Sequence, residues 1–526
     1  MIRIICPSPR ISAGRVVFSA LKRICTDEIV DLVSLASLKN WLMYPTPACW
    51  VFIDPPEAWS DLIIKALETP NTKILLLGSL PPTLANRLDA KTGLLTEDIR
   101  EGAKCAPATI HSFSESALRV DYIGAISGVE SPLPTRPFLR YDFMDEWNNL
   151  GYGAILTDDS IWSIRQIVQL PPSVAIALIF LDNLPVSAYV GLWDEPSGSL
   201  FWVNRSVGLV DSAEFCLIET FLSSHRHDRL PCWPIIGEIP YGYDAAVTMR
   251  LDCDEDVESA RELWTLYRNL DVPFSIAIHT SLLSEKKNHV LPQEILTFGG
   301  AILSHSATHA PNWGGGYENA LAECTVSRSV INDLTGKIVR YAVSPFHQNP
   351  IYALEALADA GYDGCIGGII RNDPDFLIFR SGAPIGISHG FVGHSQQCML
   401  HGDCLLDTGD PLSIFRQAFD ISRSGRSFFG YLDHPFSSRY RYGWKDELFR
   451  SAMHAEFIAY IRSAGKVLFC NEDDAMDFLA QKVAIRIIPI ENGYRVEPSS
   501  NYPLSWPVAL AYKGEIHPLK KVGINL

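Results

Sequence analysis

The second half of the chain repeats one pattern, in which a short apolar run with strand character ends at a carboxylate or an imidazole. The runs and the residues that follow them are 245–251 with Asp252, 301–304 with His305, and 428–432 with Asp433 and His434. Helical patterns separate them, at 258–270, 317–334, 351–360 and 446–464. Alternating strands and helices favour a parallel sheet covered by helices. The pattern therefore predicts an α/β fold of the (β/α) barrel kind, with functional side chains gathered on one face.

Two histidines lie four residues apart in the stretch His305-Ser306-Ala307-Thr308-His309. On a helical turn or in a tight loop, both imidazoles can reach a single ion. Asp252 and Asp254 are separated by one residue, so on a strand both carboxylates can point into one pocket. Three protein ligands, with positions left for water and substrate, are typical of a catalytic metal site. The residues therefore indicate hydrolysis by a metal-activated water, with the second carboxylate as a base.

Residues from about 243 to 475 resemble the polysaccharide deacetylase family, which is also called the NodB-homology family or carbohydrate esterase family four. The matching motifs are Arg250-Leu251-Asp252-Cys253-Asp254, His305-Ser306-Ala307-Thr308-His309, Leu432-Asp433-His434 and Gly361-Tyr362-Asp363. The resemblance implies a distorted (β/α) barrel. It also implies removal of an acetyl group from an N-acetylated sugar.

The same resemblance implies a role for each motif residue. Asp254, His305 and His309 would bind a divalent metal, usually zinc, although cobalt, nickel, manganese or iron suit the same ligands. Asp252 would be the general base and His434 the general acid. A tetrahedral oxyanion would be held by the metal and by a backbone N–H.

The third motif of that family is altered in this chain. The family has an arginine ahead of a proline, which is followed by an aromatic residue or glycine. Pro345-Phe346 fits, and Phe346 is a candidate for the backbone N–H that holds the oxyanion, but Val343 stands at the arginine position. Two alternatives stay open: Arg340 or another arginine replaces it, or the base lacks that partner. The fourth motif of the family has no match.

Two further groups of residues have alternative interpretations. Aromatic and basic residues after the acid motif could bind sugar rings and an anionic group, or could form a surface loop packed on the barrel: Arg439, Tyr440, Arg441, Tyr442 and Trp444. A second polar group could hold another metal, but its glycines favour a loop that touches substrate at the pocket mouth. It comprises His389, His394, Cys398, His401 and Cys404.

Domain boundaries follow from changes in composition. Residues 1–230 alternate apolar runs with amphipathic stretches, which predicts an α/β layer domain. The run 199–204 faintly resembles glutamine-amidotransferase-like domains. No cysteine lies at a strand-to-helix turn with a histidine partner, so we expect a non-catalytic module for substrate or assembly. A proline-rich junction at 231–242 precedes the barrel at 240–478, and a hairpin pattern predicts a small β appendix at 480–526.

Composition limits the partners and the location. The formal net charge of −16 argues against a general nucleic-acid binder, which needs a basic face. Twelve dispersed cysteines without a CxxC pair predict reduced thiols. The N-terminus lacks the pattern of a signal peptide, and the most apolar run, 174–181, is too short to span a bilayer. We expect a cytoplasmic protein without an integral membrane segment.

The expected substrate is a carbohydrate precursor of a surface polysaccharide or lipopolysaccharide, carried on a lipid or a nucleotide. Two alternatives remain at the level of sequence. One is a related C–N hydrolase that acts on a non-sugar amide. The other is a catalytically inactive carbohydrate-binding protein, which the valine of the third motif favours and the complete set of aspartates and histidines opposes.

Overall fold

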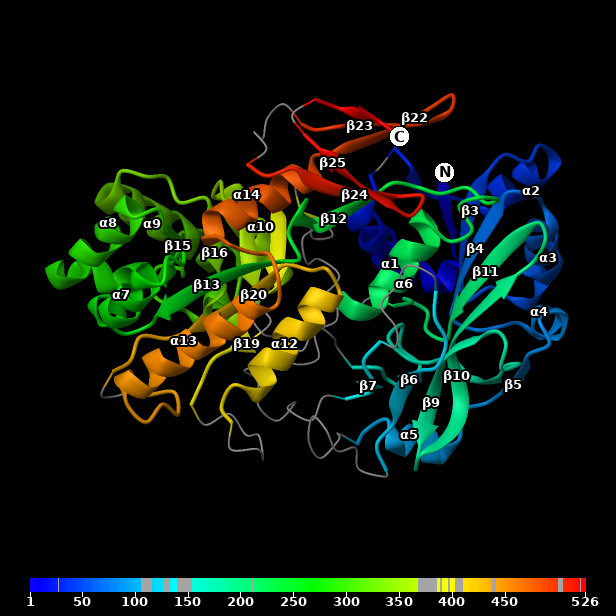
Figure 1. The fold of residues 1–526 in the computed structure, drawn as a ribbon, viewed down its shortest axis with the longest axis horizontal. Helices are drawn as coiled ribbons and strands as arrows, with labels where there is room; N and C mark the ends of the chain where they lie inside the picture. The colour runs from blue at the N-terminus through cyan, green and yellow to red at the C-terminus, as the bar shows by residue number, and fades with distance from the viewer. Residues whose placement is uncertain are drawn as a thin grey trace.

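The chain combines two large sheets, each with helices packed against it, in a mixed α/β fold (Figure 1). The structure is a computed structural model. It describes residues 1–26, 28–105, 116–126, 133–139, 154–209, 212–367, 386–387, 390–395, 398–402, 410–437, 441–499, 505–520 and 522–526.

The first sheet has a parallel half and an antiparallel half. Its order is β2-β1-β3-β4-β11-β10-β9-β6-β7, with parallel pairing from β2 to β11 and antiparallel pairing beyond. The strands are β1 (Ile2–Ile5), β2 (Val30–Leu32), β3 (Ala48–Ile53), β4 (Thr72–Leu77), β6 (Arg119–Tyr122), β7 (Arg136–Pro137), β9 (Ala175–Leu181), β10 (Leu184–Asp194) and β11 (Gly198–Val203). The helices are α1 (Ile11–Ile24), α2 (Leu35–Met43), α3 (Ser60–Glu68), α4 (Pro82–Arg87), α5 (Glu97–Gly102) and α6 (Ser212–Ser223). This arrangement agrees with the expected α/β layer.

The second sheet is parallel and curled into a half-barrel, with the order β18-β17-β16-β15-β14-β13-β20-β19 and β21 paired to β13. Its strands are β13 (Ala245–Cys253), β14 (Ser275–Ile278), β15 (Ala301–Ser304), β16 (Tyr341–Val343), β17 (Gly364–Gly367), β18 (Val392–Ser395), β19 (Cys398–Met399), β20 (Phe429–Asp433) and β21 (Val467–Phe469). The helices between them are α7 (Arg261–Asn269), α8 (Val290–Thr297), α9 (Tyr317–Thr335), α10 (Ile351–Asp359), α12 (Ser413–Ser424) and α13 (Glu447–Ser463). The strand-and-helix alternation expected for a (β/α) fold is therefore present.

The C-terminal residues form short strands, as expected for the small β appendix, and one of these strands pairs with the segment at 235–240. The segment expected as a proline-rich junction contains a strand, β12 (Ile235–Pro240), which pairs antiparallel with β24 (Val508–Tyr512). The other elements of this part are α14 (Glu472–Val483), β22 (Arg486–Ile490), β23 (Gly493–Glu497), β25 (Glu515–Leu519) and β26 (Ile524–Asn525), and in the N-terminal part β5 (Lys91–Gly93) and β8 (Ile167–Gln169) form a separate antiparallel pair. The expected hairpin is β22–β23, and it begins later than expected because α14 continues through Val483. The division into three domains stays a prediction.

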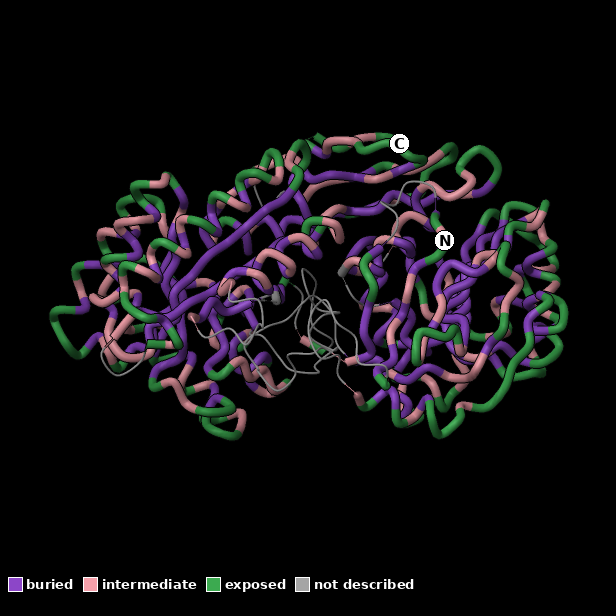
Figure 2. The backbone as a smooth tube through the Cα atoms, turned by 60° about the horizontal axis from the view of Figure 1, so that its bottom comes forward, coloured by how far each residue is buried: buried purple, intermediate pink, exposed green. Residues whose placement is uncertain are grey.

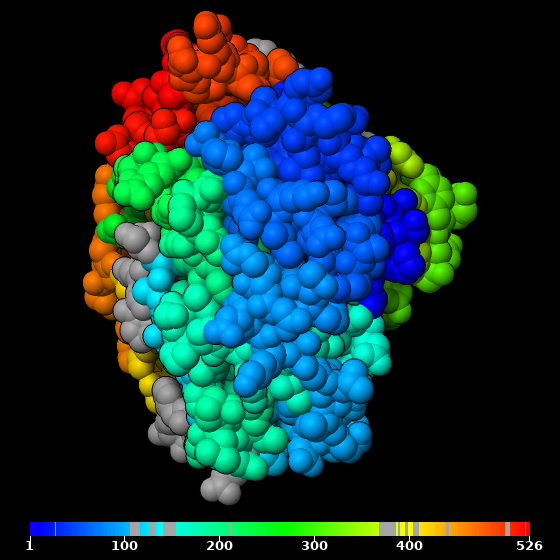
Figure 3. All heavy atoms as spheres, turned by 90° about the vertical axis from the view of Figure 1, so that its right-hand side faces the viewer, coloured from blue at the N-terminus to red at the C-terminus, as the bar shows by residue number. Residues whose placement is uncertain are grey.

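The buried residues run along the strands of both sheets, whereas the exposed residues lie on the outer helices and loops (Figure 2). Every residue of β3, β4, β11 and β13 is buried, as expected for strands covered on both faces. Figure 3 shows the outer face of the N-terminal part, with the last strands of the chain above it. None of the helices in the described segments is both long and apolar enough to cross a membrane.

Candidate metal centre

The carboxyl edge of the second sheet brings the motif residues together. Asp252 lies near the end of β13 and Asp254 directly follows that strand, while His305 follows β15 and His434 follows β20. Because β14 pairs in parallel with both β13 and β15, and β20 pairs in parallel with β13, these strand ends lie at one edge. The sequence prediction of a shared edge is thus met by the topology.

Asp254, His305 and His309 form a group with metal-ligand spacing. The Oδ1 atom of Asp254 lies 3.5 Å from the Nε2 atoms of both histidines, and the three ligand atoms lie within 4.8 Å of one another. A tetrahedral ion with bonds of about 2.0–2.1 Å would hold its ligand atoms roughly 3.4 Å apart. The observed separations therefore fit one divalent cation.

The hydrogen bonding of the ligands also fits a cation. His305 Nδ1 lies 3.0 Å from the carbonyl oxygen of Val343. A ring N–H donated there leaves the lone pair of Nε2 directed to the metal position. Asp254 Oδ1 is buried and has no hydrogen-bond partner among the described residues. A cation would satisfy this oxygen, which explains why its burial is tolerated.

The pKa values of the ligands reflect their crowding. Burial and the neighbouring His305 lower the pKa of His309 to about 4, so this imidazole is neutral near pH 7, the form that binds a cation. Burial opposes ionisation of Asp254, but His305 and His434 outweigh it and lower the pKa of Asp254. Burial likewise opposes protonation of His305, but Asp252 and Asp254 raise its pKa.

The two histidines are held by a tight loop with an unusual backbone. Ser306 and His309 have positive φ angles, of 68° and 58°, a conformation that residues other than glycine adopt at a cost. Glu323, on α9, accepts hydrogen bonds from the N–H groups of Ala307 and Thr308, both at 2.8 Å, and from Thr308 Oγ1 at 2.6 Å. Glu323 therefore clamps the loop that carries both candidate ligands, His305 and His309.

We expect the Glu323→Ala variant to bind metal about 10 to 100 times more weakly than the unaltered chain, because the loop loses the acceptor that fixes its backbone. Metal titration of chelator-treated protein measures this change. Glu318→Ala is the matched control, since Glu318 is an exposed carboxylate on the same helix. Equal metal affinity in the two variants would contradict a clamping role for Glu323.

Asp252 is held by an arginine from its own strand. Arg250 Nε lies 2.7 Å from Asp252 Oδ1 and a second guanidinium nitrogen lies 3.3 Å from Oδ2, and both side chains are buried. Burial opposes ionisation of Asp252, but Arg250 outweighs it and lowers the pKa of the carboxyl group. Arg250 is therefore the arginine that contacts Asp252 among the described residues. The signal in the sequence was the i, i+2 spacing of Arg250 and Asp252, which puts both on one face of a strand.

Arg340 has different partners, at the other end of the sheet. It precedes β16, and its guanidinium contacts Asp363 and Asp477, each at 2.6 Å. The amino end of β16 is opposite to the carboxyl edge that carries Asp252. The suggestion that Arg340 replaces the third-motif arginine is therefore not supported by its position.

A buried glutamate lies on the far side of Arg250. Glu472 Oε1 is 3.9 Å from a guanidinium nitrogen of Arg250, and neither side chain has exposed surface. Burial raises the pKa of Glu472 to about 7, even though Arg250 works in the opposite direction. Arg250 therefore faces two acids, of which Asp252 is favoured in the ionised form.

The raised pKa of Glu472 predicts a pH dependence of stability. Between the unfolded pKa near 4.5 and the folded pKa of about 7, the folded chain holds a proton that the unfolded chain has lost. This group's contribution is therefore present below pH 4.5 and falls as the pH rises toward 7, by an amount on the order of 2–3 kcal/mol. Urea unfolding at pH 5 and pH 7.5 should show a smaller loss in Glu472→Gln than in the unaltered chain. Equal losses in both proteins would refute the assignment.

His434 lies next to the candidate metal ligand Asp254. Its Nε2 atom lies 3.5 Å from Asp254 Oδ2, and its ring stacks on Tyr442 with centroids 4.1 Å apart and planes 13° apart. Asp433 accepts a hydrogen bond from the His434 N–H at 2.7 Å. The other Asp433 oxygen lies 2.7 Å from Arg450 Nε and 2.9 Å from His454 Nε2. This buried network fixes the backbone that presents His434.

The network is strongly charged although it is buried. Burial opposes ionisation of Asp433, but Arg450 and His454 outweigh it and lower the pKa of Asp433 to about 2. His454 Nδ1 in turn lies 2.8 Å from the Tyr267 hydroxyl. The sequence motif identified Asp433 only as the middle residue of Leu432-Asp433-His434, and no spacing pointed to its partners.

The remaining predicted residues are placed as follows. Phe346 is 51% exposed, and its ring centroid lies 4.4 Å from that of His309, at the edge of the site. Trp444 is buried and packs against Phe449 and His454, behind the site. Arg441 and Tyr442 are described, whereas Arg439 and Tyr440 lie outside the described residues.

The second polar group is only partly described. His389 and Cys404 lie outside the described residues. His394 and His401 are buried beside Phe428 and Phe415, with ring centroids 5.8 and 5.9 Å apart. Across the described segments, the group with metal-ligand spacing is Asp254, His305 and His309.

His347 is a polar residue near the site. Neither its spacing in the sequence nor a family motif gave it a role. It has a positive φ of 58°, as does its neighbour Phe346 at 52°. Desolvation lowers its pKa to about 3, although the nearby Asp252 works in the opposite direction. His347 is therefore a neutral imidazole close to the candidate base.

Comparison with known proteins gives structural relatives only. No family model and no curated protein sequence matches the chain. A protein from Mycobacterium smegmatis assigned as a polysaccharide deacetylase is 15% identical, with 48% of this chain and 96% of that chain covered and a TM-score of 0.36. A family 4 carbohydrate esterase from Bacillus anthracis is 15% identical, with 44% and 81% covered and a TM-score of 0.28. A CE4 family pseudoenzyme from the same organism is 12% identical, with 45% and 66% covered and a TM-score of 0.29.

These identities are low, and each match covers less than half of this chain. The structural neighbours include polysaccharide deacetylases and other proteins of carbohydrate esterase family four, the family that the sequence motifs resemble, and also an allantoinase.

Proposed function

We propose that the chain is a metal-dependent hydrolase that removes an acetyl group from an N-acetylated sugar. The observation that carries the proposal is the convergence of Asp254, His305 and His309 within 4.8 Å at one sheet edge. Beside this group stand a carboxylate held in its ionised form by Arg250 and an imidazole 3.5 Å from Asp254. Together they supply a metal site, a base and an acid.

A divalent cation held by these three ligands supplies Lewis acidity, which makes water a stronger acid and stabilises negative charge on an acyl oxygen. Zinc suits two imidazoles and one carboxylate, and cobalt, nickel, manganese or iron are further candidates.

The protein side chains handle the protons. Asp252, kept ionised by Arg250, accepts a proton from the attacking water. His434 then donates a proton to the sugar nitrogen as the C–N bond breaks. The two groups lie at the carboxyl ends of adjacent parallel strands, β13 and β20, so both can reach one bound acyl group. The backbone N–H of Phe346 is our candidate donor to the developing oxyanion.

Two aromatic rings support a sugar as the substrate. Phe346 is about half exposed beside His309, and Tyr442 stacks flat on His434. Aromatic faces pack well against the apolar C–H faces of pyranose rings because both surfaces are flat and weakly hydrated. We assign Phe346 to substrate contact, and Trp444 and Arg340 to structural roles because of their buried or distant positions. A surface-polysaccharide or lipopolysaccharide precursor is our proposed substrate class.

A panel assay tests the proposal. Acetate release is measured from nucleotide-linked and lipid-linked N-acetyl sugars, from O-acetylated sugars and from cyclic amides. Release from an N-acetyl sugar supports the proposal. Turnover of cyclic amides alone would indicate a C–N hydrolase of another class, and binding of sugars without any turnover would indicate an inactive carbohydrate-binding protein.

A further inference from the structure

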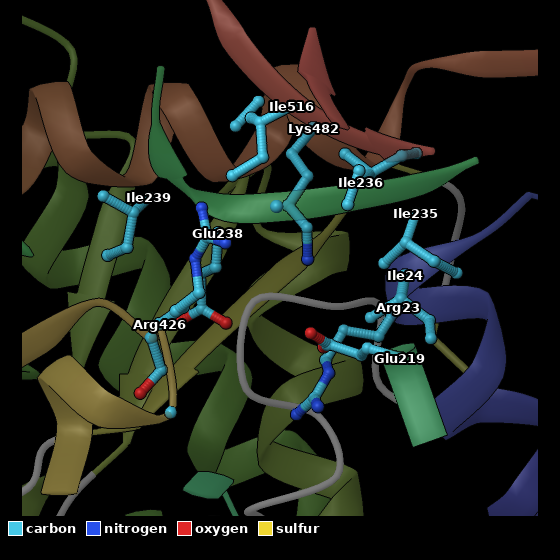
Figure 4. A pocket seen from close by; sticks show the side chains of 15 residues that line it. Arg23, Ile24, Glu219, Ile235, Ile236, Glu238, Ile239, Arg426, Lys482 and Ile516 are labelled. Carbon is cyan, nitrogen blue, oxygen red and sulfur yellow. The ribbon is translucent and has the colours of Figure 1, made fainter. Parts of the chain in front are cut away.

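A pocket lies where the N-terminal part, the half-barrel and the C-terminal strands meet, and it is lined by the loop before β20, whereas the metal group lies at the other end of that strand. It is lined by residues of α1, α6, β12, α14, β24 and β25, and of the loop that joins α12 to β20. Figure 4 shows that charged side chains from several of these elements point into it. The pocket leaves about 50 Å³ for the centres of water molecules, several times the roughly 10–15 Å³ that one water needs. It has room for a small polyatomic ion.

The lining of this pocket contains charged side chains, whereas a buried junction between parts of a protein is ordinarily apolar. Lys482 is 2% exposed, Arg23 is 9% exposed, and Figure 4 shows both facing Glu219 across the pocket. Arg426 lies at the exposed end of the lining, and Glu238 is 9% exposed. Among the described lining residues, three cationic side chains thus share the pocket with two carboxylates, which gives this part of the lining a net positive charge.

The two carboxylates differ in their surroundings. Glu238 accepts a hydrogen bond from the Phe428 N–H at 2.8 Å, which ties it to the start of β20. Burial raises the pKa of Glu219, although Arg23, Lys482 and Arg426 work in the opposite direction. Burial therefore works against the charge of Glu219, which is the carboxylate that competes with an incoming anion for Lys482 and Arg23.

We propose that this pocket binds a small oxyanion, a phosphate or carboxylate group, between Lys482, Arg23 and Arg426. Buried cations that converge on a cavity of this size suit charge-assisted hydrogen bonds to anionic oxygens. The apolar wall formed by Ile235, Ile236 and Ile239 excludes water from the other side, which strengthens these interactions. Because its lining comes from elements distant in sequence, a bound anion stabilises the junction of the parts that supply them. This site is independent of the proposed hydrolase activity.

Calorimetric titration of the full-length, chelator-treated chain with inorganic phosphate, and separately with formate, tests the proposal at constant ionic strength. Chelator treatment removes the metal that could itself bind these anions. We expect one anion per chain, with a higher melting temperature in its presence, because a ligand of the folded state stabilises it. Binding of phosphate alone assigns a phosphate group and binding of formate alone a carboxylate group. Absence of binding by both at millimolar concentration overturns the proposal.

Variants of the lining locate the bound anion. Lys482→Gln should weaken binding roughly tenfold to a hundredfold. Glu219→Gln should strengthen it several-fold, because a competing carboxylate is removed from the pocket. Glu515→Gln is the matched control, since it removes an exposed carboxylate of β25 that does not line the pocket. If Lys482→Gln does not fold, the Glu219→Gln result decides, and binding no tighter than in Glu515→Gln contradicts the proposal.

Discussion

Replacing His305 with alanine is expected to abolish stoichiometric metal binding and to lower kcat/KM for acetate release by at least about a thousandfold. His305 is 2% exposed, and its Nε2 atom is one of three ligand atoms that lie within 4.8 Å. Without it, Asp254 and His309 remain, and two ligands hold a cation too weakly to survive dilution. Metal content after gel filtration and acetate release on the same preparation measure both effects.

The control for this variant is His517→Ala, because His517 lies on β25 and outside the metal group. It should keep the metal and the activity of the unaltered chain. Full metal content together with normal acetate release in His305→Ala would show that the site is not at Asp254, His305 and His309.

Replacing Arg250 with lysine is expected to lower kcat about a hundredfold while leaving the metal content unchanged. Arg250 contacts both oxygens of Asp252, at 2.7 and 3.3 Å, and a lysine ammonium cannot reproduce this two-point contact. The base then loses its orientation, and a displacement of about 1 Å costs roughly this much in rate. A lower kcat with an unchanged metal content would show that the substitution disturbs the position of Asp252 and leaves the metal ligands intact.

Arg340→Lys is the matched control, since Arg340 pairs with Asp363 and Asp477 at the other end of the sheet. Its kcat should stay within about twofold of the unaltered value. A larger loss of kcat in Arg340→Lys than in Arg250→Lys would contradict the assignment of Arg250. Arg250→Met is less informative, because it leaves two buried acids without a counter-charge and should destabilise the fold by about 3–5 kcal/mol.

Most elements of the half-barrel could be predicted from the sequence. The expected helix at 317–334 is α9 (Tyr317–Thr335), and the expected strand at 301–304 is β15 (Ala301–Ser304). These elements are long or fully buried, so their apolar periodicity is strong. Their order along the chain also placed Asp252, Asp254, His305 and His434 at one sheet edge, because parallel strands present their carboxyl ends together.

The contacts that Glu323 and Glu472 make around the site could not be predicted from the sequence, for a physical reason. Glu323 lies in the helix after the histidine loop, and Glu472 lies in α14, far along the chain from Arg250. Nothing in the local pattern distinguishes these acids from solvated surface residues, because their role depends on which helix packs over which strand. Arg250 is different, since its spacing from Asp252 was visible in the sequence.

The strand at the junction also could not be predicted from local sequence patterns. Proline and glycine near 231–242 suggested a junction between domains and no strand was expected there, yet Ile235–Pro240 forms β12 and pairs with β24, far along the chain. Pairing between segments so distant in sequence is set by tertiary packing, which overrides local propensity. The same packing creates the charged pocket between α1, α6 and α14.

Acetate release by metal-stripped and metal-restored protein tests the central claim most directly. The substrate is the most active N-acetyl sugar of the panel, and the metal is returned in equimolar amount. We predict negligible release by the stripped chain, full recovery with one divalent ion per chain, and no recovery in His305→Ala. Release by the stripped chain at the rate of the restored chain would contradict a metal-dependent hydrolase.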